Sequence, residues 1–386
     1  KDAGRAGRYT PALPKQRPGL PMSPSSSPSP AFLAARVFLP FALGYYLSYL
    51  LRTVNAVISP DLTSELGLSA ADLGLLTSTY FFAFGLAQIP VGIALDRFGP
   101  RRVEAVLLLI TGLGAVLFAT GDGLPTLASA RGLIGLGVSA CLMGGLKGFT
   151  LWFPREKLAS MTGYIMSCGA LGAVTASAPL EALLPFIGWR GAFWAVAALS
   201  VGSAALIFFS MPDKDDGHGS GTLQEALRGV REVLVAREFW GFSGQSAFFT
   251  GGFMALQGLW AVPWLMEVNG YSRALAADHL FWLNIGMLAG QLSIGAWATP
   301  LARRGFTPLH MMQVGLFLSM VVLGLILVEV GPTLLLWCVL GYVSATGAQM
   351  YGVVAGLFPM KLSGRVTTCI NLMAFVGAFA VQWGLG

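Results

Sequence analysis

The feature that most constrains this chain is a succession of long apolar blocks, each near the length that a helix needs to cross a bilayer, about 20 residues. Short polar gaps separate the blocks, and 55% of all residues are hydrophobic while 11% are charged. Soluble domains carry about 25% charged residues. Almost no segment alternates like a barrel strand, so helices should do the crossing. The sequence therefore predicts an all-α membrane protein.

The blocks form a group of six and a group of five. They cover approximately residues 37–58, 71–95, 103–120, 124–153, 158–185 and 191–211, and then 239–268, 274–301, 309–330, 333–358 and 367–386. We accordingly divide the chain into a disordered basic Pro/Ser-rich tail (1–30), a first bundle (31–211), a cytoplasmic linker (212–238) and a second bundle (239–386). In the linker, apolar residues recur at helical spacing behind Thr222 and Glu225, which predicts a surface amphipathic helix or a solvated linker helix.

Lys and Arg predict the orientation, since cytoplasmic loops are enriched in them. They gather in every second gap, beginning with the N-terminal tail and including the linker, whereas the alternate gaps carry mainly Asp and Glu. The formal net charge is +6, but the distribution of the Lys and Arg residues among the gaps indicates membrane orientation and not nucleic-acid binding. We expect a protein of a bacterial-type inner membrane with a cytoplasmic N-terminus.

The chain resembles itself at a constant offset. Gln88 corresponds to Gln291, Gly92 to Gly295 and Arg101 to Arg304. Such repetition predicts two homologous halves of six helices each. Because the second half contributes five blocks, we expect eleven of twelve spanning helices in this sequence, with a twelfth missing at the end.

One cytoplasmic gap carries a recognisable motif, which follows the second block. Its residues are Gly92, Asp96, Arg97, Gly99, Arg101 and Arg102. This motif resembles the signature of the major facilitator superfamily, although Pro100 departs from it. The resemblance implies two pseudo-symmetric six-helix bundles and a charge-assisted latch between them on the cytoplasmic side. Arg131, which opens the fourth block in a spacing similar to the family's second motif, is a candidate for energy coupling.

The first block has a polar face. Tyr45, Tyr49, Arg52 and Asn55 recur at helical spacing within an otherwise apolar segment. A charged side chain inside a membrane is costly unless it faces a cavity or a partner. We expect Arg52 to face a substrate cavity; snorkelling or a structural ion pair is the alternative. The stretch also resembles the first helix of organophosphate:phosphate antiporters, which implies that Arg52 and Lys147 contact an anion, although the seventh block lacks the second-half Arg of those proteins.

These patterns favour a secondary transporter that moves a small organic or inorganic anion by alternating access. The candidate substrate-binding residues are Tyr45, Tyr49, Arg52, Asn55, Gln88, Lys147, Gln257, Trp260, Gln349 and Tyr351. A multidrug or metabolite efflux antiporter is the alternative within transport, and a non-transporting sensor or scaffold is the alternative outside it. Any single polar candidate could equally stabilise helix packing.

The expected partners are a small-molecule or ionic substrate, the lipid bilayer, and a coupling proton or counter-anion. We find no carboxylate near the middle of the first or fourth block, so the coupling ion stays open. The sequence has no phosphate loop and no His/Cys spacing for a metal. We therefore expect no enzymatic activity, no cofactor and no nucleic-acid binding, and we expect a monomer.

Overall fold

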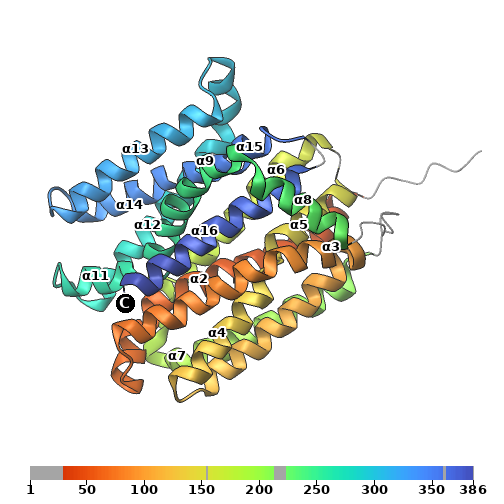
Figure 1. The fold of residues 1–386 in the computed structure, drawn as a ribbon. Helices are drawn as coiled ribbons and strands as arrows, with labels where there is room; N and C mark the ends of the chain where they lie inside the picture. Colours follow the sequence, from red (N-terminus) through yellow and green to blue (C-terminus); the bar gives the residue numbers. More distant parts are fainter. Residues whose placement is uncertain (1–28, 154, 213–222, 360–361, 386) are drawn as a thin grey trace, which may run out of the picture.

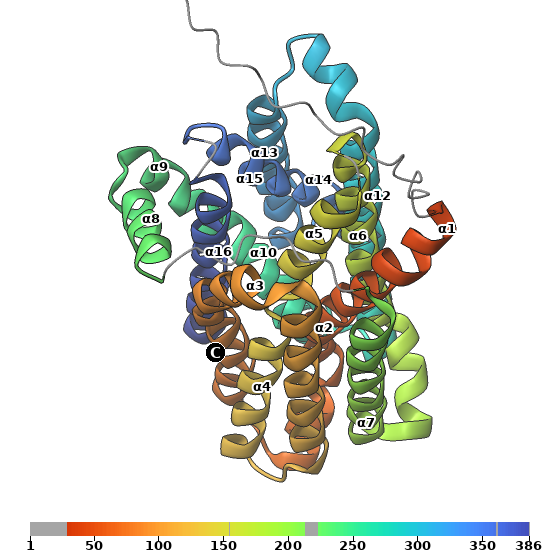
Figure 2. The same ribbon diagram turned by 90° about the vertical axis from the view of Figure 1, so that its right-hand side faces the viewer.

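The computed structural model describes residues 29–153, 155–212, 223–359 and 362–385. Helices make up nearly all of these ranges, and no β-strand occurs in them. Figures 1 and 2 show α3, α4 and α7 grouped on one side of the molecule and α12, α13 and α14 on the other. The all-helical fold that the sequence predicts is confirmed.

The first half is built from long helices with short connections. Its elements are α1 (Pro30–Leu33), the π-helical turn η1 (Ala34–Phe38), α2 (Leu39–Leu66), α3 (Ala70–Thr120), α4 (Leu124–Val138), α5 (Cys141–Trp152), α6 (Arg155–Thr175) and α7 (Ala178–Ser210). The second and third predicted blocks both lie in α3, which bends at Gly99. The φ of Gly99 is 77°, a conformation that favours glycine over residues with a Cβ.

The second half follows the helix α8 (Leu223–Val235), and its first membrane segment is divided. Its elements are α9 (Arg237–Gln245), η2 (Ser246–Gly251), α10 (Gly252–Ala255), η3 (Leu256–Trp260), α11 (Ala261–Glu267), α12 (Arg273–Arg303), α13 (Pro308–Leu327), α14 (Thr333–Ser344), η4 (Ala345–Ala348), α15 (Gln349–Ala355) and α16 (Ser363–Leu385). The elements η2 and η3 are π-helical turns, whereas η4 is a 3₁₀ turn.

Within the described ranges, eight helices are long and apolar enough to cross a membrane. They match eight of the predicted blocks. The blocks over 158–185, 239–268 and 274–301 are also helical but do not meet the same criterion. The second of these is divided by the two π-helical turns into segments that are shorter than a membrane span.

The two halves meet along several helix pairs. Helix α3 packs on α16, α6 packs on α12, and α2 packs on η3 and α11. Glycine permits close approach: a Cβ built on Gly258 would lie 3.1 Å from the carbonyl oxygen of Arg52, and one on Gly85 would lie 3.3 Å from Phe375 Cβ. Small residues at helix contacts are typical of membrane bundles.

The linker forms the helix that the sequence predicts, α8, although Thr222 lies outside the described residues. Helix α8 contacts α9 and α16. Its Val233 is fully buried in a cluster with Phe239, Val354 and Val366 of the second half. Part of the apolar face of α8 is therefore covered by the second bundle. That part does not lie on the membrane surface, where the sequence would place an amphipathic helix.

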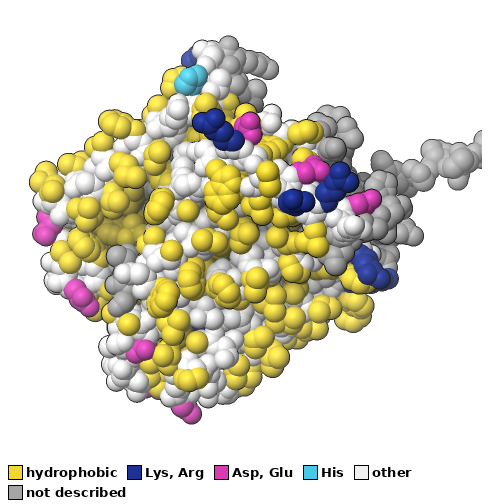
Figure 3. Space-filling model, in the orientation of Figure 1, with side chains coloured by type: hydrophobic (Ala, Val, Ile, Leu, Met, Phe, Trp, Pro, Cys, Tyr) yellow, Lys and Arg dark blue, Asp and Glu magenta, His cyan; other side chains and the backbone are white. Residues whose placement is uncertain are grey.

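The surface combines a broad apolar area with charged margins. Figure 3 shows hydrophobic side chains spread over the whole face that corresponds to Figure 1. On this face, Lys and Arg lie along the upper and right margins, whereas the left and lower margins carry only Asp and Glu. Such a distribution is typical of a protein surrounded by lipid with unequal loop charge on its two sides.

Candidate functional site

A central cavity of about 90 Å³ lies between the two halves. Its wall takes residues from α2, α3, α5 and α6 on one side and from η2, α10, η3, α12, η4, α15 and α16 on the other. Among the predicted substrate-binding residues, the cavity brings together Tyr45, Tyr49, Arg52, Gln88, Gln257 and Tyr351. Residues from both halves thus face one space, as a site between two bundles requires.

Arg52 is the one cation that lines this cavity among the described residues. Its side chain is 4% exposed, and its guanidinium carbon lies 4.4 Å from the ring centroid of Tyr49, 5.7 Å from that of Phe84 and 5.4 Å from that of Phe375. Aromatic faces attract a cation but do not neutralise it.

No carboxylate in the described ranges forms an ion pair with Arg52. Its Nε atom also has no hydrogen-bond partner there. A buried cation is costly unless an anion or several acceptors compensate it. Arg52 is therefore positioned to receive an acceptor from the cavity.

A chain of amide and hydroxyl groups crosses the cavity beside Arg52. Gln88 donates from Nε2 to the carbonyl oxygen of Ser139, at 3.3 Å. Asn371 donates to Gln88 Oε1 at 3.4 Å, and Tyr351 donates to Asn371 Oδ1 at 2.7 Å. Gln88 belongs to the first half and the other two to the second, so these bonds connect the halves at the cavity.

A second polar bridge lies on another wall. Gln257 donates from Nε2 to Asn284 Oδ1 at 2.6 Å, and Asn284 donates to the carbonyl oxygen of Ala173 at 3.0 Å. Ala173 belongs to α6 of the first half, whereas Asn284 belongs to α12 of the second. The amide of Asn284 therefore positions the cavity-facing Gln257 against the opposite half.

Four predicted substrate-binding residues do not line this cavity. Asn55 lies buried between α2 and α3, where it donates to Thr77 Oγ1 at 2.9 Å. Trp260 faces two other, more apolar cavities beside α13. Lys147 and Gln349 are half-buried on α5 and α15. The polar face of the first block extends beyond the cavity, and Asn55 at its end packs against α3.

The structure describes part of the signature loop. The backbone of Asp96 lies in α3, but its side chain is outside the described residues. Arg101 donates from Nε to the carbonyl oxygen of Phe208 at 2.7 Å and lies 5.0 Å from the Phe208 ring centroid. This contact joins the loop to the end of α7 in the same half. A latch between the two halves stays a prediction.

Arg131 is fully buried on α4 and does not line the cavity. It donates from Nη1 to the carbonyl oxygen of Leu51 at 2.9 Å, and its guanidinium carbon lies 4.7 Å from the Tyr80 ring centroid. Arg131 thus binds α2 at Leu51, the residue that precedes Arg52 in the sequence. A role in coupling stays a prediction.

The sequence interpretation missed several residues around the cavity and one behind it. Asn371, Phe84 and Phe375 line the cavity, yet each looks like an ordinary residue of an apolar block. Glu104 is a fully buried carboxyl on α3. It is the second residue of its block and follows Arg101 and Arg102, so it reads as part of the charged loop. The sequence signal that could have found it is a single acid with apolar residues on both sides, Val103 before it and Ala105 after it.

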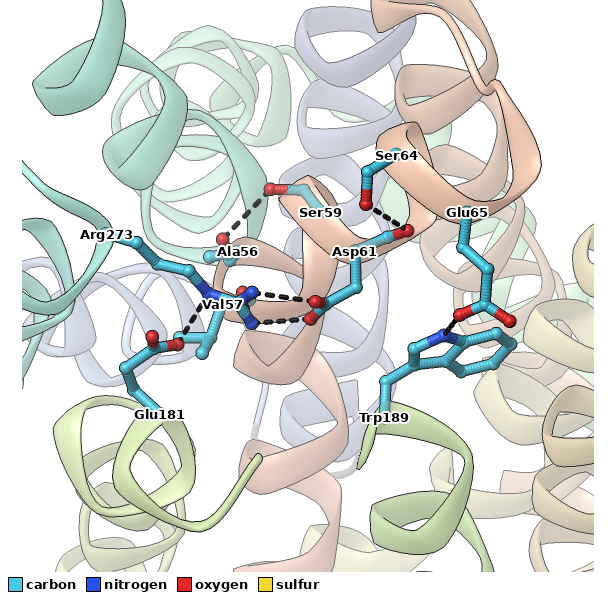
Figure 4. A network of polar contacts seen from close by, with 9 residues as sticks. All are labelled: Ala56, Val57, Ser59, Asp61, Ser64, Glu65, Glu181, Trp189 and Arg273. Carbon is cyan, nitrogen blue, oxygen red and sulfur yellow. Dashed lines mark hydrogen bonds and ion pairs between the residues drawn. The ribbon is translucent and has the colours of Figure 1, made fainter. Parts of the chain in front are cut away.

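One end of the seam between the halves carries a charged cluster (Figure 4). Arg273, in the first turn of α12, donates from Nε to Glu181 Oε2 of α7 and from Nη1 to Asp61 Oδ1 of α2, both at 2.7 Å. It also donates from Nη2 to the carbonyl oxygen of Val57 at 3.1 Å. This cluster therefore joins the second half to two helices of the first.

The family of the chain follows from comparison with known proteins. The model of the Major Facilitator Superfamily matches residues 41–381. A probable sulfoacetate transporter of Cupriavidus necator is 31% identical over 47% of this chain, and the alignment spans 43% of that relative, less than half its length. A probable hexose phosphate transport protein of Chlamydia pneumoniae is 23% identical over 91% of this chain and 84% of the relative.

The fold agrees with this match. A bacterial homolog of the human lysosomal transporter Spinster, solved in an inward-facing and occupied conformation, superposes with a TM-score of 0.70. The identity is 21%, and the comparison covers 91% of this chain and 81% of that one. The helical bundle, the membrane-length segments and the family match agree with the resemblance of the loop motif, and the chain belongs to the major facilitator superfamily.

Proposed function

We propose that this protein is a secondary transporter that carries a small organic anion through the central cavity by alternating access. The observation that carries the proposal is Arg52, whose guanidinium is buried at the cavity wall among aromatic rings, with no carboxylate paired to it in the described ranges. A substrate carboxylate, sulfonate or phosphate would supply the missing negative charge. Two oxygens of any of these groups can accept the paired N–H donors of a guanidinium.

The surrounding groups suit such a ligand. Tyr49 and Gln88 lie on the same wall as Arg52, while Gln257 and Tyr351 face it from the second half. Hydroxyls and amides can bind the uncharged part of a polar anion and can bridge the halves once the substrate is in place. Both curated relatives described above are named as transporters of anions, sulfoacetate and hexose phosphate. This agreement supports an anionic substrate for this chain as well.

The test uses purified protein in proteoliposomes with two anionic probes, radiolabelled sulfoacetate and glucose 6-phosphate. We expect saturable uptake of at least one probe, competition by unlabelled anions, and no uptake of glucose as the neutral control. Arg52→Gln should abolish uptake while the protein still elutes as a folded species. Inhibition by lipophilic cations alone, with no anion taken up or competing, would contradict an anion site and favour the efflux alternative.

A further inference from the structure

Glu104 is a buried carboxyl that the proposed substrate site does not use. It lies on α3, near the start of the segment after the bend at Gly99, and is 0% exposed. Neither carboxyl oxygen accepts a hydrogen bond from a nitrogen or oxygen donor among the described residues, and the Cys141 thiol is the polar group that faces it. Leaving an ionised carboxylate in such a place would cost far more than leaving a neutral acid there.

Two glycines create the space that this carboxyl fills. A Cβ built on Gly44 of α2 would lie 2.5 Å from Glu104 Oε1, and one built on Gly144 of α5 would meet Oε2. Because real Cβ atoms essentially never come so close to other heavy atoms, any larger residue would displace the carboxyl. The backbones of α2 and α5 therefore pack directly on the acid.

The charged and titratable groups around Glu104 are few. From α5 the thiol of Cys141 faces it, and from α2 the facing residue is Gly44, which has no side chain. Helices α4, α7 and α16 also pack on α3 but, within the described chain, bring no charged group to this carboxyl. Arg101, one turn earlier on α3, donates to Phe208 instead. Among the residues that the structure describes, no cation pairs with this carboxyl to hold its ionised form.

The acid lies directly behind the cavity wall. Tyr45 lines the cavity from α2, and Leu142 and Met143 line it from α5. Gly44, Cys141 and Gly144, which are next to these residues in the sequence, contact Glu104 from adjacent faces of the same two helices. Glu104 is therefore in contact with two helices that form the substrate site.

We propose that Glu104 is a proton-binding site that couples a proton to the movement of α2 and α5 against α3. With the proton bound, the neutral acid fits between the glycines as the structure shows. Proton release leaves a carboxylate that requires water, so α3 must separate from α2 or α5 and the cavity wall shifts. The step transfers one proton between the Glu104 carboxylate and water, and no other bond changes. This inference rests on the proposed transport function for its physiological use.

The first arm of the test needs no substrate. Infrared difference spectra of the full chain in lipid, recorded across a pH series, should show a protonated-carboxyl C=O band that titrates in the wild-type protein. Glu104→Gln, which resembles the protonated form in shape, should lose this band. Glu329→Gln is the matched control, because Glu329 is exposed at the end of α13 and should leave the band unchanged. Should Glu104→Gln fail to fold, Glu104→Asp should shift the band in frequency.

The second arm measures energy coupling with sulfoacetate and glucose 6-phosphate as probes. An inwardly directed proton gradient should stimulate uptake by the wild type and by Glu329→Gln. In Glu104→Gln the stimulation should be lost, while exchange of labelled for unlabelled probe persists. A wild type that transports neither probe refutes the proposed anion function, yet the spectra still decide the proton site. A band that never titrates, or unchanged stimulation in Glu104→Gln, would overturn the inference.

Discussion

Two arginines at the seam between the halves, the half-buried Arg273 and the buried Arg52, have opposite surroundings. Arg273 meets two carboxylates and a backbone carbonyl, so its charge is neutralised within the protein. Arg52 meets three aromatic rings and, in the described ranges, no carboxylate. A fully paired ion cluster holds elements together, whereas an unpaired buried cation favours binding of an anion. From this comparison we propose that the first arginine clamps the halves together and that the second binds the ligand.

The largest expected effect comes from removing the unpaired charge. Arg52→Gln should lower initial transport rates by about 100-fold or more, since hydrogen bonds to charged groups contribute about 1.5–3 kcal/mol each and the charge itself is also lost. Arg52→Lys keeps the charge but loses the fork, so we expect it to retain roughly a tenth of the rate. Uptake in proteoliposomes at matched protein amounts measures both. Wild-type KM and rate in Arg52→Gln would show that the arginine is structural.

The paired arginine should affect conformation more than affinity. Arg273→Gln leaves Asp61 and Glu181 without their cation, so the two halves should separate more readily at this end. A Val57→Cys reporter, at a buried residue whose carbonyl binds Arg273, should then react with an impermeant thiol reagent about tenfold faster, an opening free-energy change of roughly 1.4 kcal/mol.

Arg190 offers a matched control for this effect. It pairs with Glu65 and Asp122, which belong to the same half as Arg190 itself. Arg190→Gln should therefore leave the reactivity of the reporter near the wild-type value. The exchanged pair Arg273→Asp with Asp61→Arg should restore part of the protection. Equal reactivity in Arg273→Gln and Arg190→Gln would contradict the clamp.

A smaller effect should come from the polar bridge beside Arg52. Tyr351→Phe removes the hydroxyl that donates to Asn371, and a single hydrogen bond contributes about 1 kcal/mol. We expect KM to rise about fivefold with little change in the maximal rate. Tyr271→Phe is the control, because its hydroxyl donates to Thr333 and Tyr271 does not line the cavity. Similar KM values in Tyr351→Phe and Tyr271→Phe would show that the bond between Tyr351 and Asn371 does not contribute to substrate binding.

The smallest effect is expected at Lys147. It is half-buried on α5 and does not line the cavity, so it supplies no direct contact to a substrate there. Lys147→Gln should change KM by less than about twofold, because a charge without direct contact to the substrate contributes little. Concentration-dependent uptake measures this value. A loss comparable with that of Arg52→Lys would show that Lys147 reaches the substrate in another conformation.

The sequence predicted the parts of this molecule that depend on local patterns. Apolar length gave the membrane helices, and helical spacing placed Tyr45, Tyr49 and Arg52 on one face of α2. Long-range contacts could not be predicted in this way. Asn55 shares that face, yet it bonds to Thr77 on α3 because the helices approach closely there. Arg273 looked like a loop residue, and only the fold shows Asp61 and Glu181 beside it.

The two π-helical turns of the second half, η2 and η3, have a consequence for hydrogen exchange. A π turn widens the backbone, and its amides bond to carbonyls five residues back with poorer geometry than in an α-helix. Phe249, Thr250 and Gln257 in these turns line the cavity. Their amide protons should therefore exchange with deuterium sooner than those of the regular helix α2 on the opposite wall. The cavity would then have one side, formed by η2 and η3, whose backbone opens readily, and one side, formed by α2, whose backbone is more stable. A local change from π-helix to α-helix in η2 and η3 would therefore be a way to enclose a substrate.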